Sequence, residues 1–245
     1  MSDQVPRRPL PHDFHPQVPE LSVSSTDLSD GGTLPDAHVY AKGNSSPQIG
    51  WSAGPEGTGS YAVTCYDPDA PTGSGFWHWT VFDIPADVAE LPAGAGTGGF
   101  EGLPAGAVQV RNDYGSRDFG GAAPPEGDGS HRYVFTVYAV DREKLGPDAD
   151  ATPALVGFHL RFHAIARGRL IAHYEEQAPG RSRTPGCMPP PPPPCPRPGA
   201  QTRPISAVLA RSCPESGDPA GSRGEMEACP STSSATCWAA MRGPI

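Results

Sequence analysis

Cysteine is almost absent from the first 177 residues of this 245-residue chain, where Cys65 is the only one. A segment with one thiol, placed in an apolar run, has no disulfide framework and is typical of a reduced protein with a small buried side chain there. We therefore predict that residues 1–177, called the body below, are cytoplasmic. The other five cysteines all follow residue 177: Cys187, Cys195, Cys213, Cys229 and Cys237.

Long apolar runs are also missing. No stretch approaches the roughly 18 apolar residues of a membrane-spanning helix. No apolar segment follows the two arginines at positions 7 and 8, as it would in a secretory signal. The sequence therefore predicts no stable membrane insertion.

Basic residues are scarce in the same body. Residues 1 to 177 contain 11 Lys and Arg against 23 Asp and Glu, a balance of −12, whereas residues 178 to 245 contain 7 against 4, a balance of +3. Binding to phosphate backbones and anionic membranes requires clustered Lys and Arg. We therefore predict no nucleic-acid partner.

The segment 178–245 has 15 of the 32 prolines and no hydrophobic pattern, so we predict a disordered Pro-rich tail. Its six consecutive prolines, Pro189 to Pro194, would suit a polyproline II segment that docks in an aromatic groove. The composition also fits out-of-frame reading of a GC-rich gene, and we favour the hypothesis of a frameshifted or extended end. Resequencing the locus tests it.

The body reads as a mainly β (α+β) domain over residues 20–177, preceded by a flexible arm at 1–19. The clearest predicted strands are 60–66, 77–84 and 129–140, which are rich in β-branched and aromatic residues. Weaker candidates are 21–24, 38–41, 48–51, 108–112 and an edge strand at 165–174. A helix is expected from the N-cap Thr152, with Pro153 in its first turn, to about residue 163.

Strand alternation predicts which side chains share a face of the sheet. His131, Tyr133 and Phe135 fall on one face of their strand. In the segment 77–84, His78, Thr80 and Phe82 are expected on one face and Trp77, Trp79 and Val81 on the other.

A stiff acidic loop, Asp67-Pro68-Asp69-Ala70-Pro71, follows the strand 60–66. The prolines fix their own φ and hold the preceding residues extended, and rigid polar loops at strand ends commonly carry binding sites. Asp67 and Asp69 could equally make only Asx-type turn hydrogen bonds. The imidazoles of His78 and His131 favour a site.

Most chemistries that these side chains could perform are disfavoured by their spacing. Imidazole with carboxylate suits zinc or iron, but no metal-ligand spacing is present, so we predict no metal and no cofactor. Two catalytic carboxylates of a glycosidase would flank the sugar bond, whereas Asp67 and Asp69 share one loop. No Gly-x-Ser-x-Gly elbow or P-loop occurs. A small pocket for an anionic head group remains.

Four motifs in order give the chain a recognisable resemblance. They are Asp-Pro-Asp-Ala-Pro at 67–71, His78-Trp79, Gly-Gly-x-x-Pro-Pro at 120–125 and His131-Arg132-Tyr133. From about Pro19 to Tyr174 the sequence resembles the phosphatidylethanolamine-binding protein family, and within it the bacterial Raf-kinase-inhibitor-like branch. Phe119, Ala122 and Ala123 depart from the bacterial pattern, where Tyr, Pro and Cys are more usual.

The resemblance implies a large antiparallel sheet packed on a smaller one, one or two short helices, and a pocket at one edge that takes phosphate or similar anions. It implies that the chain is a non-enzymatic binding protein for a small anionic ligand or phospholipid head group. A regulator that inhibits a kinase or protease is the alternative, and a hydrolase is less favoured. The implied ligand-binding residues are Asp67, Asp69, Pro71, His78, Gly121, Ala123, Pro124, His131 and Tyr133.

Overall fold

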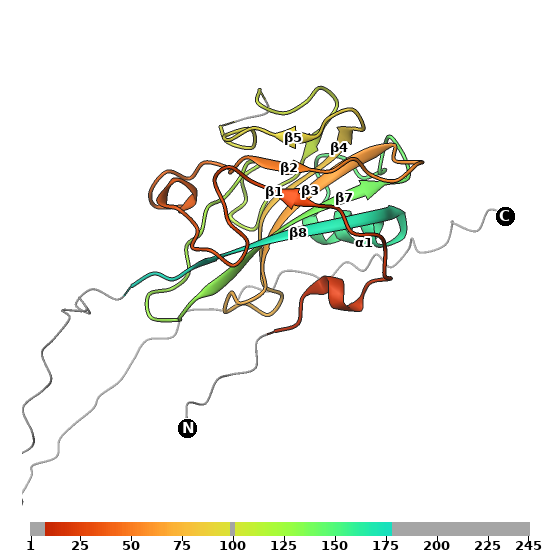
Figure 1. Cartoon of the computed structure of the whole chain (residues 1–245). Helices are drawn as coiled ribbons and strands as arrows, with labels where there is room; N and C mark the ends of the chain where they lie inside the picture. The colour runs from red at the N-terminus through yellow and green to blue at the C-terminus, as the bar shows by residue number, and fades with distance from the viewer. Residues whose placement is uncertain (1–7, 99–100, 178–245) are drawn as a thin grey trace, which may run out of the picture. The chain divides into compact units, whose positions relative to one another are not determined.

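The larger of two β-sheets forms the centre of the domain (Figure 1). A computed structural model describes residues 8–98 and 101–177. The sheet has five antiparallel strands in the order β6-β4-β3-β7-β8, so β3 pairs with β7 and β4 with β6 although neither pair is consecutive in sequence. The strands are β3 (Ser60–Asp67), β4 (Phe76–Pro85), β6 (Val108–Gln109), β7 (His131–Val140) and β8 (Ala164–Tyr174).

A smaller sheet packs on one face of the large one and encloses the main core. It contains β1 (Val23–Ser24), β2 (Ile49–Trp51) and β5 (Glu90–Leu91) in that order. The core between the two sheets is built from fully buried side chains such as Ile49 and Leu91 of the small sheet and Val63, Trp79 and Phe135 of the large one. The predicted mainly β, two-sheet architecture is confirmed.

The helix α1 (Pro153–His163) covers the opposite face of the large sheet. The Oγ1 of Thr152 accepts a hydrogen bond from the backbone N–H of Leu155 at 3.2 Å, which confirms the predicted N-cap. Val156 and Leu160 pack in a second core cluster with Phe82 and Tyr138. Among the described residues no helix has the length and apolar character of a membrane span.

The predicted strand at 38–41 is wrong. A 3-10 helix η2 (Asp36–His38) occupies its start, and turns follow. Pro35 opens this helix, and Nδ1 of His38 lies 2.7 Å from the carbonyl oxygen of Ser45, so the chain folds back on itself instead of extending. Only Val39 keeps a single bridge, to Ala122. The strands expected at 21–24 and 108–112 are shorter than predicted.

A β-bulge in β4 changes the predicted faces of that strand. Cys65 pairs with Trp79 and Tyr66 pairs with Trp77, so His78 is an extra residue opposite the β3 strand. His78 therefore lies on the same face as Trp79, where its ring is 5.0 Å from that of Tyr133. Trp77 moves to the helix-covered face, with its ring 4.5 Å from that of Tyr66.

The arm before β1 packs on the domain along its described part, residues 8–19. A 3-10 helix η1 (Pro11–Phe14) buries Leu10 and His12 at its start, and Nε2 of His12 lies 2.7 Å from the hydroxyl of Tyr138. This differs from the loose arm expected from the sequence, which has no periodicity there. Residues 1–7 and the predicted tail 178–245 lie outside the described residues.

We expect His12 to make the fold sensitive to acid. Burial and the nearby Arg167 guanidinium lower the pKa of His12 to about 4, whereas an unfolded histidine titrates near 6.5. Because the folded pKa is depressed, this contribution to stability is present above pH 6.5 and is lost as the pH falls toward 4, by about 3 kcal/mol in total. Urea unfolding measured from pH 7 to pH 4 should show a smaller fall for His12→Gln than for the natural chain. An equal fall in both would contradict this.

Candidate functional site

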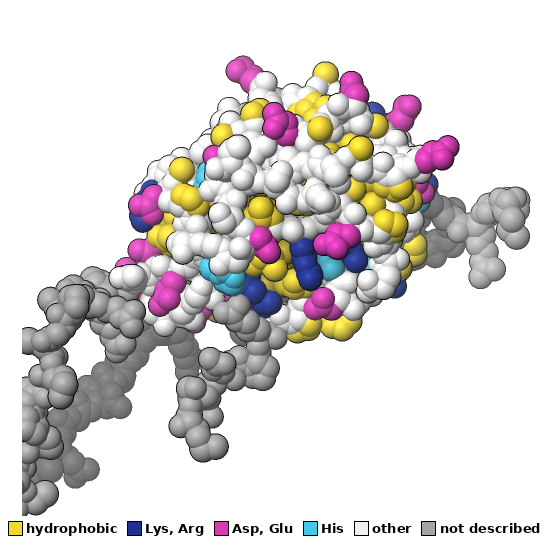
Figure 2. All heavy atoms as spheres, in the orientation of Figure 1, with side chains coloured by type: hydrophobic (Ala, Val, Ile, Leu, Met, Phe, Trp, Pro, Cys, Tyr) yellow, Lys and Arg dark blue, Asp and Glu magenta, His cyan; other side chains and the backbone are white. Residues whose placement is uncertain are grey.

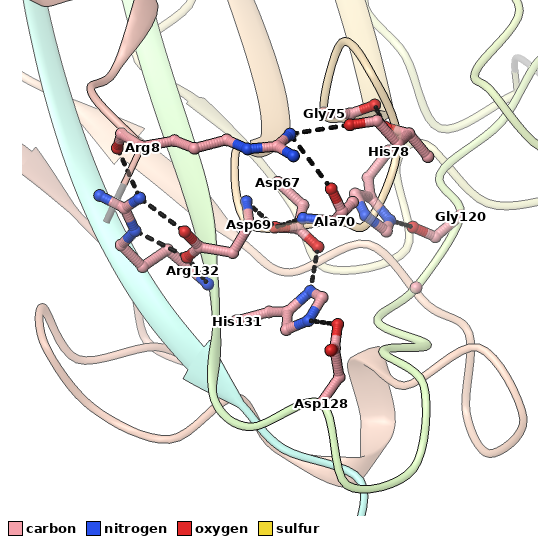
Figure 3. A network of polar contacts seen from close by, with 12 residues as sticks. Arg8, Asp67, Asp69, Ala70, Gly75, His78, Gly120, Asp128, His131 and Arg132 are labelled. Atoms are coloured by element: carbon pink, nitrogen blue, oxygen red, sulfur yellow. Dashed lines mark hydrogen bonds and ion pairs between the residues drawn. The ribbon is translucent and has the colours of Figure 1, made fainter. Parts of the chain in front are cut away.

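Three segments meet at one end of the large sheet and form a small cavity there. Because β3 and β7 are antiparallel neighbours, the acidic loop after β3 lies beside His131 at the start of β7 (Figure 3). The cavity has a volume of about 180 Å³. Its walls are Asp67, Ala70, Pro71, Thr72, Phe76, His78, Tyr114, Ala123, Pro124, Pro125, His131 and Tyr133.

The buried carboxylate of Asp67 organises the site. Its Oδ1 accepts hydrogen bonds from the backbone N–H groups of Asp69 at 2.7 Å and Ala70 at 3.1 Å, which is the Asx-type turn allowed by the sequence. Its Oδ2 lies 2.7 Å from Nδ1 of His131. Asp67 therefore stabilises the turn and also contacts His131, so its role is not limited to turn hydrogen bonds.

Both ring nitrogens of His131 contact carboxylates. Nδ1 faces Asp67, and Nε2 lies 3.1 Å from Oδ2 of Asp128, a side chain that is 41% exposed. Desolvation lowers the pKa of His131, but the hydrogen bonds and charges of Asp67 and Asp128 together outweigh it and raise the pKa. Because each ring nitrogen faces a carboxylate oxygen, which only accepts, the imidazolium is the form of His131 that satisfies both contacts.

His78 has the opposite electrostatic environment. Its Nδ1 lies 2.7 Å from the carbonyl oxygen of Gly120, and a carbonyl only accepts, so Nδ1 carries the proton. Burial lowers the pKa of His78 although Gly120 and Asp67 oppose this effect. The ring is then neutral, and its Nε2 is a buried acceptor without a partner among the described residues.

Aromatic side chains form the rest of the wall. The His78 ring lies 5.0 Å from the rings of both Phe76 and Tyr133, and Phe76 lies 4.7 Å from Tyr114. The Tyr133 hydroxyl is buried near the backbone of Ala123 and makes no hydrogen bond of ordinary geometry within the described residues. Burial raises the pKa of Tyr133, so this hydroxyl stays protonated and can donate.

Seven of the nine predicted ligand-binding residues line the cavity, and Asp69 and Gly121 do not. Asp69 instead forms a two-pronged ion pair with Arg132, in which Nε and Nη2 each lie 2.7 Å from a carboxylate oxygen (Figure 3). Gly121 has a backbone role, because a Cβ there would lie 2.5 Å from the carbonyl oxygen of His38. Its N–H donates to Oδ1 of Asn44 at 2.7 Å.

Sequence reasoning missed three kinds of residue at this site. Phe76 and Tyr114 build the wall, and nothing in their spacing indicated it. Asp128 stands three residues before His131, a separation that could have suggested a contact. Arg8, in the arm, donates from Nη1 to the carbonyl oxygen of Thr72 at 2.8 Å and accepts at its own carbonyl from Arg132. Long-range contacts of this kind leave no local signal.

Within residues 8–98 and 101–177, no group of three or more His, Cys, Asp or Glu side chains is arranged to hold a metal ion.

Comparison with known proteins identifies close relatives over the domain. The YbcL protein of Escherichia coli K12 is 48% identical over 167 residues, which make up 66% of this chain and 91% of that protein. The YbhB protein of the same organism is 46% identical over 63% of this chain and 99% of that protein.

Solved structures agree with the sequence matches. The crystal structure of E. coli YbcL, described as a new member of the mammalian PEBP family, gives a TM-score of 0.63 at 48% identity over 64% of this chain and 99% of that chain. A phosphatidylethanolamine-binding protein homologue from Chlamydia trachomatis gives 0.55 at 26% identity, again over 64% and 99%.

The family model matches most of the described domain. The model for the phosphatidylethanolamine-binding protein family covers residues 24–175, which include every wall residue of the cavity. Together with the two-sheet fold and the relatives above, this match settles the family. The chain belongs to the phosphatidylethanolamine-binding protein family, in the branch that contains the bacterial YbcL and YbhB proteins.

Proposed function

We propose that this protein binds, without turnover, a small anion that still carries a proton, such as a phosphate monoester in its singly charged form. The observation that carries the proposal is the unpartnered Nε2 of His78, a buried acceptor at the wall of the cavity. A buried polar group without a partner is costly, so a ligand that satisfies it gains free energy.

The wall groups require a ligand that both donates and accepts. Nε2 of His78 needs a donor, such as a P–O–H group, while the Tyr133 hydroxyl is free to donate to a phosphoryl oxygen. The His131 imidazolium adds a positive charge beside the negative Asp67. A fully ionised dianion would meet Asp67 without a proton to offer His78, so the singly charged form is favoured.

The same side chains argue against turnover. Burial raises the pKa of Tyr133, so its hydroxyl is a poor nucleophile. The Thr72 hydroxyl donates to the backbone carbonyl of Gly75, away from any base. Asp67 is committed to two backbone N–H groups and to His131. We accordingly assign the site to binding.

The charges on one face of the domain favour a free head group or metabolite over attachment to a membrane. On the face shown in Figure 2, Lys and Arg side chains are few and lie among acidic ones. Anionic membranes hold proteins through clustered basic residues. Cytoplasmic location and inhibition of a kinase or protease stay predictions from the sequence.

Calorimetric titration with phosphate and with sulfate at pH 6 tests the proposal. The two anions have similar size, but sulfate carries no proton at this pH and cannot donate to His78. We expect phosphate to bind weakly and sulfate to bind at least about tenfold more weakly, the equivalent of one lost charge-assisted hydrogen bond. Equal affinities, or no heat with either anion, would defeat the proposal.

Asp128→Asn should strengthen phosphate binding at pH 6. The partly exposed carboxylate of Asp128 accepts a hydrogen bond from Nε2 of His131, and its negative charge repels an entering anion. Asparagine removes this repulsion while its side-chain oxygen can still accept from Nε2, so we expect a gain of about threefold to tenfold in affinity. Asp87→Ala, at an exposed position on another loop, is the control and should change nothing. Weaker binding in Asp128→Asn would show that Asp128 helps to hold the ligand.

The affinity for a phosphate monoester such as methyl phosphate should fall as the pH rises. A monoester loses its last proton near pH 6, and the raised pKa of His131 places the loss of its charge above the ordinary value of about 6.5. Both changes weaken the attraction between the ligand and the site as the pH rises. Titrations at pH 6 and pH 8.5 should show clearly weaker binding at the higher pH, and stronger binding there would contradict this protonation scheme.

A further inference from the structure

A second cavity lies on the other face of the large sheet, under α1. Its volume is about 290 Å³, near the lower end for small-molecule sites. Its aromatic walls are Tyr66, Trp77 and Tyr138 from the sheet and Phe158 from the helix. The cavity is separate from the anion site, because the bulge at His78 turns Trp77 and His78 to opposite faces of the sheet.

One lining residue of the cavity has a buried polar atom without a partner among the described residues. His12 is 8% exposed, and while its Nε2 contacts the Tyr138 hydroxyl at 2.7 Å, its Nδ1 has no hydrogen-bond partner among the described residues. An apolar space alone would not indicate a ligand. An orphaned ring nitrogen in the wall of an aromatic cavity does, because a polar atom of a ligand would satisfy it.

A single positive charge lines the cavity. It belongs to Arg161, because burial and the nearby Arg167 lower the pKa of His15, and no Asp or Glu is among the lining residues. One Nη1 hydrogen of Arg161 goes to the carbonyl oxygen of Phe14 at 3.0 Å, and its other N–H groups have no hydrogen-bond partner within the described residues. Residues 1–177 have a formal net charge of −12, so the Arg161 guanidinium is a local site of positive charge for a negative group.

We propose that this second cavity binds a small aromatic carboxylate. The ring of the ligand lies among Trp77, Tyr66 and Phe158, and its carboxylate accepts from Arg161 and from Nδ1 of His12. Aromatic walls favour a flat ring, and a planar guanidinium favours a carboxylate. This binding function is additional to the anion site at the end of the sheet.

Gly157 provides a direct way to block the cavity. It lies in α1 in the cavity wall, and a Cβ added there would meet nothing within 4 Å. Gly157→Leu should therefore fill the space without backbone strain and with better helix propensity. Gly157→Ala is the matched control, since a single methyl group leaves most of the space open.

The test uses phenylacetate and its neutral analogue phenylacetamide as probes, with the full chain, and follows the indole N–H signal of Trp77 by NMR. We expect phenylacetate to shift this signal and to bind at least fivefold more tightly than phenylacetamide. Gly157→Leu should lose binding of both probes, and Gly157→Ala should keep it. Arg161→Gln should weaken phenylacetate alone, to the level of the amide.

Three results would overturn the proposal. They are no shift of Trp77 at millimolar phenylacetate, binding that survives Gly157→Leu, and equal affinity for the acid and the amide in the natural chain. Phosphate titration of Gly157→Leu checks that the variant is folded, because the anion site does not involve α1. Loss of phenylacetate binding with unchanged phosphate binding would assign the ligand to the second cavity.

Discussion

Replacing Asp67 with alanine should lower the free energy of unfolding by about 3–5 kcal/mol, the usual loss when one partner of a buried ion pair is removed. Asp67 is 2% exposed and satisfies two backbone N–H groups besides His131. Without it, the His131 imidazolium would keep only the partly exposed Asp128, and the turn would lose its acceptor. Urea unfolding at pH 6.5 measures the effect.

Asp67→Asn and Asp87→Ala are the controls for this loss. The asparagine oxygen can still accept from the backbone N–H groups, so Asp67→Asn should cost less than Asp67→Ala. Asp87 is exposed, and its replacement should change stability by no more than about 0.5 kcal/mol. A loss below about 1 kcal/mol for Asp67→Ala would show that the carboxylate does not organise the site.

His78→Asn should reduce phosphate affinity by about 10-fold to 100-fold, which corresponds to about 1.5–3 kcal/mol for a hydrogen bond to a charged group. The asparagine side-chain NH₂ can replace Nδ1 as the donor to the Gly120 carbonyl. No atom replaces Nε2. Calorimetry at pH 6 measures the loss, and unchanged affinity would remove His78 from the site.

Tyr133→Phe provides the matched comparison for this loss of binding. It removes only a hydroxyl that is buried and unsatisfied in the described residues, so phosphate affinity should fall by about fivefold to tenfold. Stability should stay the same or rise, because the phenylalanine leaves no polar group to desolvate. A substitution that weakens binding while it maintains or raises stability is expected at a residue whose role is to bind a ligand.

Much of the fold follows from local patterns in the sequence. The strands β3, β4 and β7 and the helix α1 were predictable because each has a strong period and clear ends, such as the Thr152 cap. That the acidic loop and His131 share one site was implied by the family resemblance and not by a local pattern. Asp67 and His131 do meet, at 2.7 Å.

The missed features depend on contacts between distant segments. The bulge that moves His78 to the other face of the sheet arises from the pairing of β4 with β3. The alternation of residues along β4 alone therefore could not predict it. Asp69 pairs with Arg132, which is 63 residues away, and so leaves the cavity wall. The arm packs on the domain through the contact between His12 and Tyr138, which are 126 residues apart. No hydrophobic pattern in the arm indicates this contact.

The ring nitrogens of His78 give the most direct test of the anion site. In a ¹⁵N NMR titration at pH 6, the account predicts that Nε2 of free His78 has the shift of an unprotonated nitrogen. Phosphate should move that signal progressively toward a hydrogen-bonded value, whereas sulfate should not. Phosphate binding that leaves the Nε2 signal of His78 unchanged would contradict the account.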